Sequence, residues 1–444
     1  MATIARTLER IKQDLRTFLP DRLILQCCRQ AGHRWRRRRF EPLATFHLFI
    51  LQVLNFNTAI VHLRHLAKQS VNAAAYCKAR MRLPLAALQM LLRRTAAAMA
   101  SGSQSRWCRL RVLLVDGSST IAPDTPQLLK NFGHPSGQKP GCGLPVAKIL
   151  GLMDAFSGLI MEVLCFPLFT HDMSRVCKLH PLLGSGDRLV GDRGFCSFAH
   201  LSMLFSRGIA GLFRMHQRQI VSFRPHRKRR GKDKRGKPSS RFVKRLGKWD
   251  QIVQWIKPKE PPRWMSRRQY AALPATLRVR ELRFVLPRRG QRTRVVTIVT
   301  TLLDPKLYPK EKIAALYAVR WRVETHFAEL KTTLKMRKLK SKTVAGVQKE
   351  LAIYCLVYNL IHAVMLQAAA RQKVTADRIS FIDTLRWLLS AEPGEELPNL
   401  LVNRLRPDRH EPRTLKDRPA TYSKMTVSRQ QWKKRLKIRV KTLK

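Results

Sequence analysis

Three carboxylates stand out in a chain that is poor in acidic residues. The sequence has 28 Asp and Glu against 87 Lys and Arg. Asp116 ends the apolar run VLLVD, Asp192 ends RLVGD, and Glu324 lies in the helical stretch YAVRWRVETHFAELK, residues 317–331. Carboxylates gathered in one place repel each other unless hard divalent cations hold them. Two such cations about 4 Å apart can activate a water or hydroxyl on one side of a phosphorus atom and stabilise the leaving oxygen on the other.

Each carboxylate also has an ordinary explanation. An aspartate after a strand commonly caps a turn or a helix. Glu324 could pair with Arg320 one turn earlier, a contact that contributes roughly 0.2–0.5 kcal/mol. Two aspartates at the ends of predicted strands, together with a glutamate on a later helix, instead favour one carboxylate cluster that binds divalent cations.

The helix around Glu324 is predicted to be amphipathic. At about 100° per residue, one face carries four polar residues: Tyr317, Arg320, Glu324 and Lys331. The neighbouring face is apolar and should pack on the core: Leu316, Val319, Val323, Phe327, Leu330 and Leu334. Glu324 is therefore expected to be half-buried at the edge of this apolar stripe. Arg322 and Glu329 are expected on the far side, towards water.

The charge balance predicts a polyanionic partner. The 444 residues carry a formal net charge of +59, and self-repulsion of this size works against compactness. Lys and Arg side chains along nucleic acid release counterions and give strong, sequence-independent affinity. Nucleic acid is the first expectation and an anionic membrane surface the second. With 45% hydrophobic residues, the chain should be globular, with two or three domains.

Other features favour a protein of the reducing cytoplasm. Nine cysteines without a CxxC pair suggest neither a zinc ribbon nor a disulfide framework. The N-terminus, MATIARTLERIKQDL, is typical of an amphipathic helix rather than a signal peptide. Residues 351–370 are uncharged over about the length that spans a bilayer. Because Asn359, His362 and Gln367 interrupt this run, we expect a buried core helix, with a membrane span as the alternative.

The order of apolar runs predicts a mixed sheet with helices packed against it. Residues 1–103 are predicted to be helices that form either a DNA-reading module or a cap with a solvated basic face, and 98–105 are predicted to be a linker. A strand ending at Asp116 and a hairpin turning at DAFSG come next, and strands then alternate with helices up to about 216. A basic low-complexity loop and three more strands follow before the glutamate helix.

These residues match the signature of a known family. The chain resembles the DDE transposases of bacterial insertion sequences, of the type with a Tyr-Arg-Glu-Lys signature (the insertion sequence four family). That signature is Tyr, two residues, Arg, three residues, Glu, six residues, Lys. It is matched at every position by Tyr317, Arg320, Glu324 and Lys331. The stretches VDGSS at Asp116 and VGDRGF at Asp192 match the family's two aspartate motifs, and the resemblance covers roughly residues 40–370.

The resemblance implies an α/β fold: a ribonuclease-H-like mixed sheet with flanking helices, interrupted by a β-rich insertion, with an N-terminal helical region and C-terminal helices. The expected divisions are a helical DNA-binding region (1–103), the first part of the catalytic domain (104–216), a basic β-rich insertion (217–305), the second part with the glutamate helix (306–372), and a C-terminal helical region with a basic tail (373–444).

The resemblance also implies an activity. Family members cut each end of their element, form a hairpin by attack of the freed 3′-hydroxyl on the opposite strand, open the hairpin with water, and join the ends to target DNA. The catalytic and metal-binding residues would be Asp116, Asp192 and Glu324, with Mg²⁺ as cofactor and Mn²⁺ as substitute. The residues that contact DNA would be Tyr317, Arg320 and Lys331. An insertion tryptophan can hold a flipped base; Trp249, Trp255 and Trp264 are candidates, although each is more simply a core residue.

The implied partners are double-stranded DNA, as terminal inverted repeats and target, and a second copy of the chain in a synaptic homodimer. The implied location is the bacterial cytoplasm at the nucleoid, without a membrane. The alternatives are a catalytically silent DNA-binding protein derived from a transposase, a metal-dependent DNA nuclease without a joining step, and an RNA-binding protein.

A few further residues have simple structural explanations. Asp154 in MDAFSG is expected to stabilise a hairpin turn, and Asp172 after His171 to cap a helix. Lys139 and Lys148 either contact DNA or lie on a solvated face. Gly117 suits a tight turn beside the metal site, where bulk would obstruct DNA.

Overall fold

The computed structural model of the chain describes residues 19–404, except 37–38, 68–69, 102–105, 137–142, 217–218, 220, 225–236, 286–294 and 392–394, and beyond them 427, 431 and 434–435. Four predictions lie wholly or largely outside these residues: the N-terminal amphipathic helix, Lys139, most of the basic low-complexity loop, and the basic tail.

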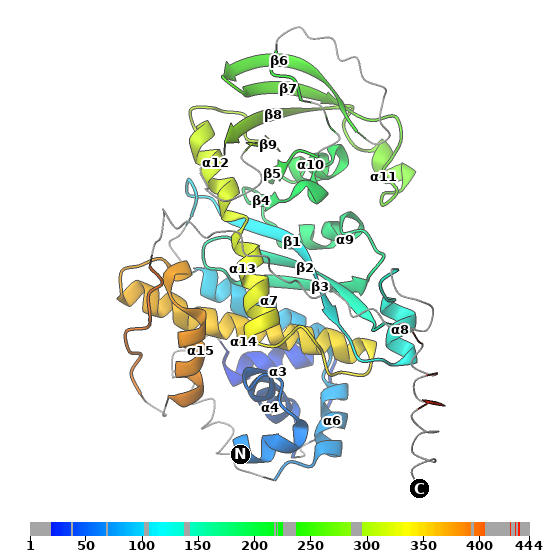
Figure 1. Ribbon diagram of the computed structural model, residues 1–444, viewed down its shortest axis with the longest axis vertical. Coiled ribbons are helices and arrows are strands. Elements are labelled where there is room, and N and C mark those ends of the chain that lie inside the picture. The colour runs from blue at the N-terminus through cyan, green and yellow to red at the C-terminus, as the bar shows by residue number, and fades with distance from the viewer. Residues whose placement is uncertain are drawn as a thin grey trace.

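The described strands form one nine-stranded mixed sheet in the order β3-β2-β1-β4-β5-β9-β8-β7-β6 (Figure 1). Its first five strands are β1 Val112–Ile121, β2 Val146–Asp154, β3 Ile160–Pro167, β4 Arg188–Gly191 and β5 Ala210–Arg214. Strands β1, β2 and β3 are antiparallel neighbours, whereas β4 and β5 run parallel to β1. This order and these directions make the ribonuclease-H-like sheet that the family resemblance predicted.

The remaining strands continue the same sheet beyond β5. They are β6 Ser239–Gly247, β7 Asp250–Ile256, β8 Thr276–Val285 and β9 Val295–Thr300. The last of them, β9, pairs antiparallel with β5, so the later strands extend the catalytic sheet and do not stand apart from it. Strand β6 was not predicted, because it is an exposed edge strand whose charged residues hide any apolar alternation.

Alternating side chains of the sheet pack into two separate cores. Val112 and Leu114 of β1 belong to one large cluster, and Leu113 and Val115 belong to the other. Since successive side chains of a strand point to opposite faces, helices cover the sheet on both sides. The smaller helical layer consists of α9 Met173–Val176, η2 Cys177–Leu182 and α10 Phe198–Phe205.

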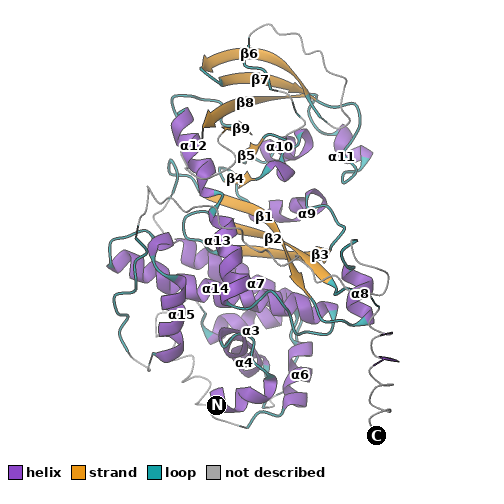
Figure 2. Cartoon of the chain, in the orientation of Figure 1, coloured by secondary structure: helices purple, strands orange, loops and turns teal. Residues whose placement is uncertain are grey.

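The larger helical layer is built around α14, Val344–Arg371. Its most apolar window is long and apolar enough to cross a membrane, but 89% of that window is buried within the fold. It packs against β3 and against helices from both ends of the chain, as Figure 2 shows below the sheet. The prediction of a core helix for 351–370 is therefore confirmed.

Helices from both ends of the chain surround α14. The N-terminal ones are α3 Asp21–Gln30, α4 Pro42–Leu54, α5 Leu63–Leu66, α6 Ala73–Arg82 and α7 Leu85–Ser101. The later ones are α13 Arg322–Ala328, the π-helical turn η4 Glu329–Thr333, and α15 Phe381–Ser390. Helix α12 Lys310–Val319 leads into α13 from the other end of the sheet, near β8 and β9 (Figure 1). Two further short helices are α8 Pro126–Phe132 and α11 Arg267–Ala271. Because α7 continues through Ser101, the predicted linker at 98–105 is wrong for its first four residues.

Candidate active site

The two aspartates lie side by side on neighbouring parallel strands, Asp116 within β1 and Asp192 directly after β4. Val115 of β1 pairs with Gly191 of β4, so Asp116 and Asp192 occupy the next positions of the two strands. Asp192 keeps an extended backbone, with φ −79° and ψ −174°, and its Oδ1 accepts a hydrogen bond from the Gly194 N–H at 2.7 Å. Strand β4 ends at Gly191, but β1 continues through Asp116 and Gly117 to Ile121. The predictions that the first strand ends at Asp116 and that Gly117 forms a tight turn are therefore wrong, although the parallel register still brings Asp116 beside Asp192.

Arg320 links the first aspartate to the helix glutamate. Its Nη1 lies 3.5 Å from Oδ2 of Asp116, and its Nη2 lies 3.6 Å from Oε1 of Glu324. The Glu324 side chain is 63% exposed, so the expectation that it would be half-buried is wrong. It stands on the rim of the site, where its carboxylate is open to solvent.

The carboxylates act on one another electrostatically. Burial raises the pKa of Asp116 to about 6, against the lowering effect of a hydrogen bond from the Gly117 N–H. The negative charges of Asp192 and Glu324 raise it further, and the Arg320 guanidinium opposes them. Asp192 and Glu324 are thus near enough to act on Asp116, and carboxylate oxygens are the ligands that hard divalent cations prefer.

A glycine that the sequence analysis did not single out lets the glutamate helix approach. Gly151 of β2 is the direct partner of Asp116 in the β1–β2 ladder. A Cβ added at Gly151 would lie 3.2 Å from Cζ of Phe327, which is on α13. Glycine within a strand often marks such a close approach, and this was the available signal.

The helix bearing the signature is not regular. It tightens between α12 and α13, where Val323 N–H bonds to the Arg320 carbonyl and Glu324 N–H to the Trp321 carbonyl, each three residues back. A turn of this kind advances about 120° per residue instead of 100°. The four signature residues consequently do not share one regular helical face.

Tyr317 and Arg320 occupy the buried side of the site. Tyr317 is only 1% exposed, and burial raises its pKa to about 12. The Arg320 guanidinium lies 5.9 Å from the Tyr317 ring and 5.0 Å from the Trp321 ring. Among the described residues, Nε of Arg320 has no hydrogen-bond partner, so this cation retains an unused donor.

Lys331 reaches the same strand as Asp116. Its Nζ donates a hydrogen bond to Oγ of Ser118 at 3.1 Å, and Ser118 lies two residues after Asp116 on β1. Burial, together with the positive charge of Arg337, lowers the pKa of Lys331. A cation therefore stands beside the carboxylates on the face of β1 that packs against α13.

Glu329 does not lie where the helical wheel placed it, towards water. The Glu329 side chain is only 18% exposed and faces His326, His362 and Tyr358. Burial would raise its pKa, but the two neighbouring histidines outweigh that effect and lower the pKa to about 2. Arg322 is closer to expectation, since it forms a partly exposed ion pair with Asp377 at 2.9 Å.

Two of the simpler expectations meet different outcomes. Asp154 stabilises the hairpin turn as predicted: its Oδ1 accepts hydrogen bonds from the N–H groups of Phe156 and Ser157. Asp172 does not cap α9 through its side chain. It lies 2.9 Å from Nζ of Lys148 instead, and it also sits close to Gly117, where an added Cβ would be 3.1 Å from Asp172 Oδ2.

The three candidate tryptophans differ in exposure. Trp255 is fully buried and donates from Nε1 to Oε1 of Glu281 at 3.1 Å. Trp264 is partly buried against the second core cluster. Trp249 is 37% exposed, with Nζ of Lys248 and of Lys310 at 5.4 and 5.9 Å from its ring. Of the three, Trp249 alone combines an exposed ring with cations.

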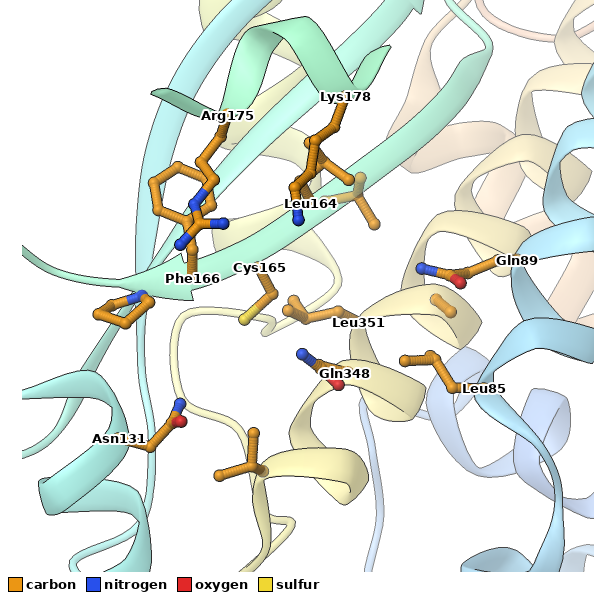
Figure 3. Close-up of a pocket in the computed structure, with 14 residues that line it drawn as sticks. Leu85, Gln89, Asn131, Leu164, Cys165, Phe166, Arg175, Lys178, Gln348 and Leu351 are labelled. Carbon is orange, nitrogen blue, oxygen red and sulfur yellow. The ribbon is translucent and has the colours of Figure 1, made fainter. Parts of the chain in front are cut away.

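A separate pocket lies between β3, α7 and α14. Figure 3 shows Arg175, Lys178, Gln89 and Gln348 around it. The described residues that line this pocket include none of the three carboxylates. It is therefore distinct from the candidate active site.

A ribonuclease-H-like sheet with aspartates on two neighbouring parallel strands and a glutamate on a later helix defines the class of DNA-cleaving and strand-transferring enzymes known as DDE transposases. The chain belongs to this class by sequence as well: the family model of the transposase DDE domain matches residues 107–360. It is 25% identical over 373 residues to the transposase InsG for insertion sequence element IS4 of Escherichia coli (strain K12), over 79% of this chain and 78% of that protein. The predicted membership of the insertion sequence four family is thus confirmed.

A solved structure also resembles the chain. It is the piggyBac transposase synaptic complex with hairpin DNA, at 11% sequence identity and a TM-score of 0.42, covering 86% of this chain and 79% of that one. As a member of a DDE transposase family, the present chain acts on DNA and uses divalent metal ions.

Proposed function

We propose that the chain moves its insertion sequence by cut-and-paste transposition, with Asp116, Asp192 and Glu324 holding two Mg²⁺ ions. The observation that carries this proposal is the contact of one guanidinium, that of Arg320, with both Asp116 and Glu324. The raised pKa of Asp116, to which Asp192 and Glu324 contribute, supports it. Hard carboxylate oxygens suit Mg²⁺, and Mn²⁺ substitutes for it.

When bound, the two Mg²⁺ ions would stabilise both the attacking and the leaving oxygen and so lower the barrier to in-line attack at phosphorus. The remaining tasks belong to the chain. Arg320 and Lys331 bind backbone phosphates and orient the strand. Tyr317, which is 1% exposed, supports this contact from within the fold, with the Arg320 guanidinium 5.9 Å from its ring. Arg320 is suited to phosphate binding because its planar guanidinium fork matches phosphate geometry.

The same site serves each step of the proposed reaction. Water attacks a phosphodiester at each end of the element, and the bond to the 3′-oxygen breaks. The freed 3′-hydroxyl then attacks the opposite strand and closes a hairpin, which water opens. Finally the 3′-hydroxyls attack target phosphodiesters, so that each joining step exchanges one phosphodiester bond for another.

Hairpin formation needs a sharply bent end, and a flipped base relieves that strain. Within this proposal Trp249 receives the base, because its ring is exposed and faces cations. Trp255 cannot do so without unfolding the sheet, since it is fully buried. Aromatic stacking holds a base of any identity.

The partners follow from the same proposal. Double-stranded DNA enters as terminal inverted repeats and then as target, and a homodimer brings the two ends together in the cytoplasm, at the nucleoid. Residues 1–103 contribute DNA binding, 104–216 and 306–372 form the catalytic domain, 217–305 form the insertion, and 373–444 form the C-terminal region.

Two substrates test this function. The first is a supercoiled plasmid carrying the element's ends, and the second is a precleaved end with a free 3′-hydroxyl supplied with target plasmid. We expect the parent to cut and join in Mg²⁺, and Asp116→Ala to bind DNA without either reaction. Equal activity of parent and variant would refute this site. A parent that binds without cutting would identify a silent DNA-binding protein, and cutting without joining would identify a nuclease.

A further inference from the structure

We propose that His326, Glu329 and His362 form a second metal site, for a zinc-like transition metal, which fastens the glutamate helix to α14. One ring nitrogen of each histidine and one oxygen of Glu329 all lie within 4.8 Å of one another. Oε2 of Glu329 is 3.6 Å from Nδ1 of His326 and 3.7 Å from Nε2 of His362. Of these two distances, the 3.7 Å from Glu329 Oε2 to His362 Nε2 joins two prospective ligand atoms. It is close to the separation of about 3.3–3.5 Å between ligand atoms of a tetrahedral zinc ion with bonds of about 2.0–2.1 Å.

Hydrogen bonds fix the orientation of both imidazole rings. Nδ1 of His362 lies 3.2 Å from the carbonyl oxygen of Ser157, and a carbonyl can only accept, so Nδ1 carries the proton. The Tyr358 hydroxyl donates to Glu329 Oε2 at 2.9 Å and lies 2.7 Å from Nδ1 of His326. Because its one proton is used on Glu329, it accepts from His326 Nδ1–H. Metal-binding histidines typically donate their second N–H in this way.

This arrangement leaves two buried lone pairs unused. With both protons on Nδ1, each Nε2 is an acceptor, and neither has a hydrogen-bond partner among the described residues. His326 is 6% exposed and His362 is 3% exposed, so solvent reaches them poorly. Unpaired lone pairs beside a buried carboxylate are costly, and a shared cation would satisfy all three groups at once.

Gly158, in the β2–β3 turn, leaves room for the imidazole rings of His326 and His362. A Cβ at Gly158 would lie 2.7 Å from Cε1 of His362 and 3.0 Å from Cε1 of His326. Gly158 also has a φ of +72°, which side-chain-bearing residues rarely adopt. The β2–β3 turn can therefore approach both histidines only with glycine at this position.

The ligand set selects a different metal from that of the carboxylate site. Two imidazoles and one carboxylate suit Zn²⁺ and related transition metals, whereas Mg²⁺ prefers oxygen ligands and retains its waters. Three protein ligands leave the fourth position for water or for the nearby Tyr358 oxygen. The two sites would thus bind different metals because their ligand atoms differ, although both use the helix that carries Glu324.

The expected role is to position the glutamate helix. Glu329 follows Glu324 by five residues, at the start of the π-helical turn η4, while His362 is on α14 and Ser157 is in the β2–β3 turn. A metal here would join these three elements. Structural zinc sites contribute directly to folding stability.

The test uses full-length, metal-free protein with Glu324→Gln, which removes one carboxylate of the active site. Titration with Zn²⁺ should give one tight site per chain, and Co²⁺ should give the visible bands of tetrahedral coordination without a thiolate charge-transfer band. His362→Gln and Glu329→Gln should weaken Zn²⁺ binding by about 100-fold or more, and Gly158→Ala by about 10-fold or more. His65→Ala removes one of two neighbouring exposed histidines and should change nothing.

Three results would overturn the proposal: no stoichiometric Zn²⁺ in the Glu324→Gln protein, equal Zn²⁺ affinity after His362→Gln, or a Co²⁺ spectrum of thiolate type. Circular dichroism and DNA binding check that each variant folds. If the ligand variants do not fold, the Zn²⁺ stoichiometry and Co²⁺ spectrum of the folded Glu324→Gln protein decide the matter.

Discussion

Phe327 packs on Gly151, the residue directly across the β1–β2 ladder from Asp116. Glu324 lies three residues before Phe327, about one helical turn along α13. The contact between the Phe327 ring and the backbone of Gly151 consequently sets the distance from α13 to the strand that carries Asp116. The proposed catalytic residues Glu324 and Asp116 are thus held in range by a pair of residues that have no proposed part in the chemistry.

Gly151→Val should push α13 away from the sheet. The added Cβ would stand 3.2 Å from the Phe327 ring, and overpacking of this kind costs about 1–3 kcal/mol of unfolding free energy. We expect a higher Mg²⁺ concentration for half-maximal cleavage, with DNA binding retained. The control is Gly247→Val, because a Cβ at Gly247 meets nothing within 4 Å. An unchanged Mg²⁺ requirement in Gly151→Val would show that the contact does not set the site.

Asp116→Asn should abolish cleavage and yet stabilise the metal-free protein at neutral pH. The folded-state pKa of Asp116 is raised to about 6 from an ordinary value of 3.8. The folded protein therefore holds this proton more tightly than the unfolded chain, and that stabilisation is lost as pH rises from about 4 through 6. Above pH 7 the asparagine variant should be more stable by about 1–3 kcal/mol.

Chemical denaturation in the presence of a chelator measures this difference. At pH 4 the parent and the Asp116→Asn variant should have nearly equal free energies of unfolding, and at pH 7 the variant should have the larger one. Added Mg²⁺ should stabilise the parent and leave the variant unaffected, since a ligand that binds only the folded state shifts the equilibrium towards it. A difference in unfolding free energy that is independent of pH would mean that Asp116 is not the titrating group.

The carboxylates were predictable because each depends on local pattern. Asp116 and Asp192 each follow a run of apolar residues, and the parallel pairing of β1 with β4 then brings them together, although β1 continues past Asp116 to Ile121. Core helix α14 was predictable for the same reason, since an uncharged run interrupted by Asn359 and His362 suits a protein interior better than lipid. In these cases the local sequence and the final packing agree.

Other features depend on departures from regular geometry. The helical wheel placed Glu329 in water, but the tightened turn around Arg320 and the π-helical turn that begins at Glu329 change the angle per residue. The role of Gly151 depends on strand register and on a ring from another element. Long-range register and local helix irregularities are set by tertiary packing, which periodicity alone does not contain.

Lys331→Met should weaken binding of the element's ends and reduce the dependence of binding on salt. If Lys331 neutralises one phosphate, its loss should lower the slope of log affinity against log salt by about 0.9. Ser118→Ala removes the hydrogen-bond partner of Lys331 while keeping the charge, so its slope should match the parent. Lys130→Met, on exposed α8, is a control for net charge. A slope unchanged by Lys331→Met would exclude the phosphate contact.

Trp249→Ala should separate nicking from hairpin formation. Loss of base stacking costs about 1–3 kcal/mol, so hairpin closure should slow by roughly 5- to 150-fold while the first nick proceeds at the parental rate. Denaturing gels of end-labelled ends resolve the nicked and hairpin products. Trp249→Phe should restore most of the closure rate, and Phe242→Ala, which removes another exposed ring from the same β6–β7 hairpin, should have little effect. If nicking and closure slowed equally in Trp249→Ala, the ring would serve DNA binding in general and not the flipped base.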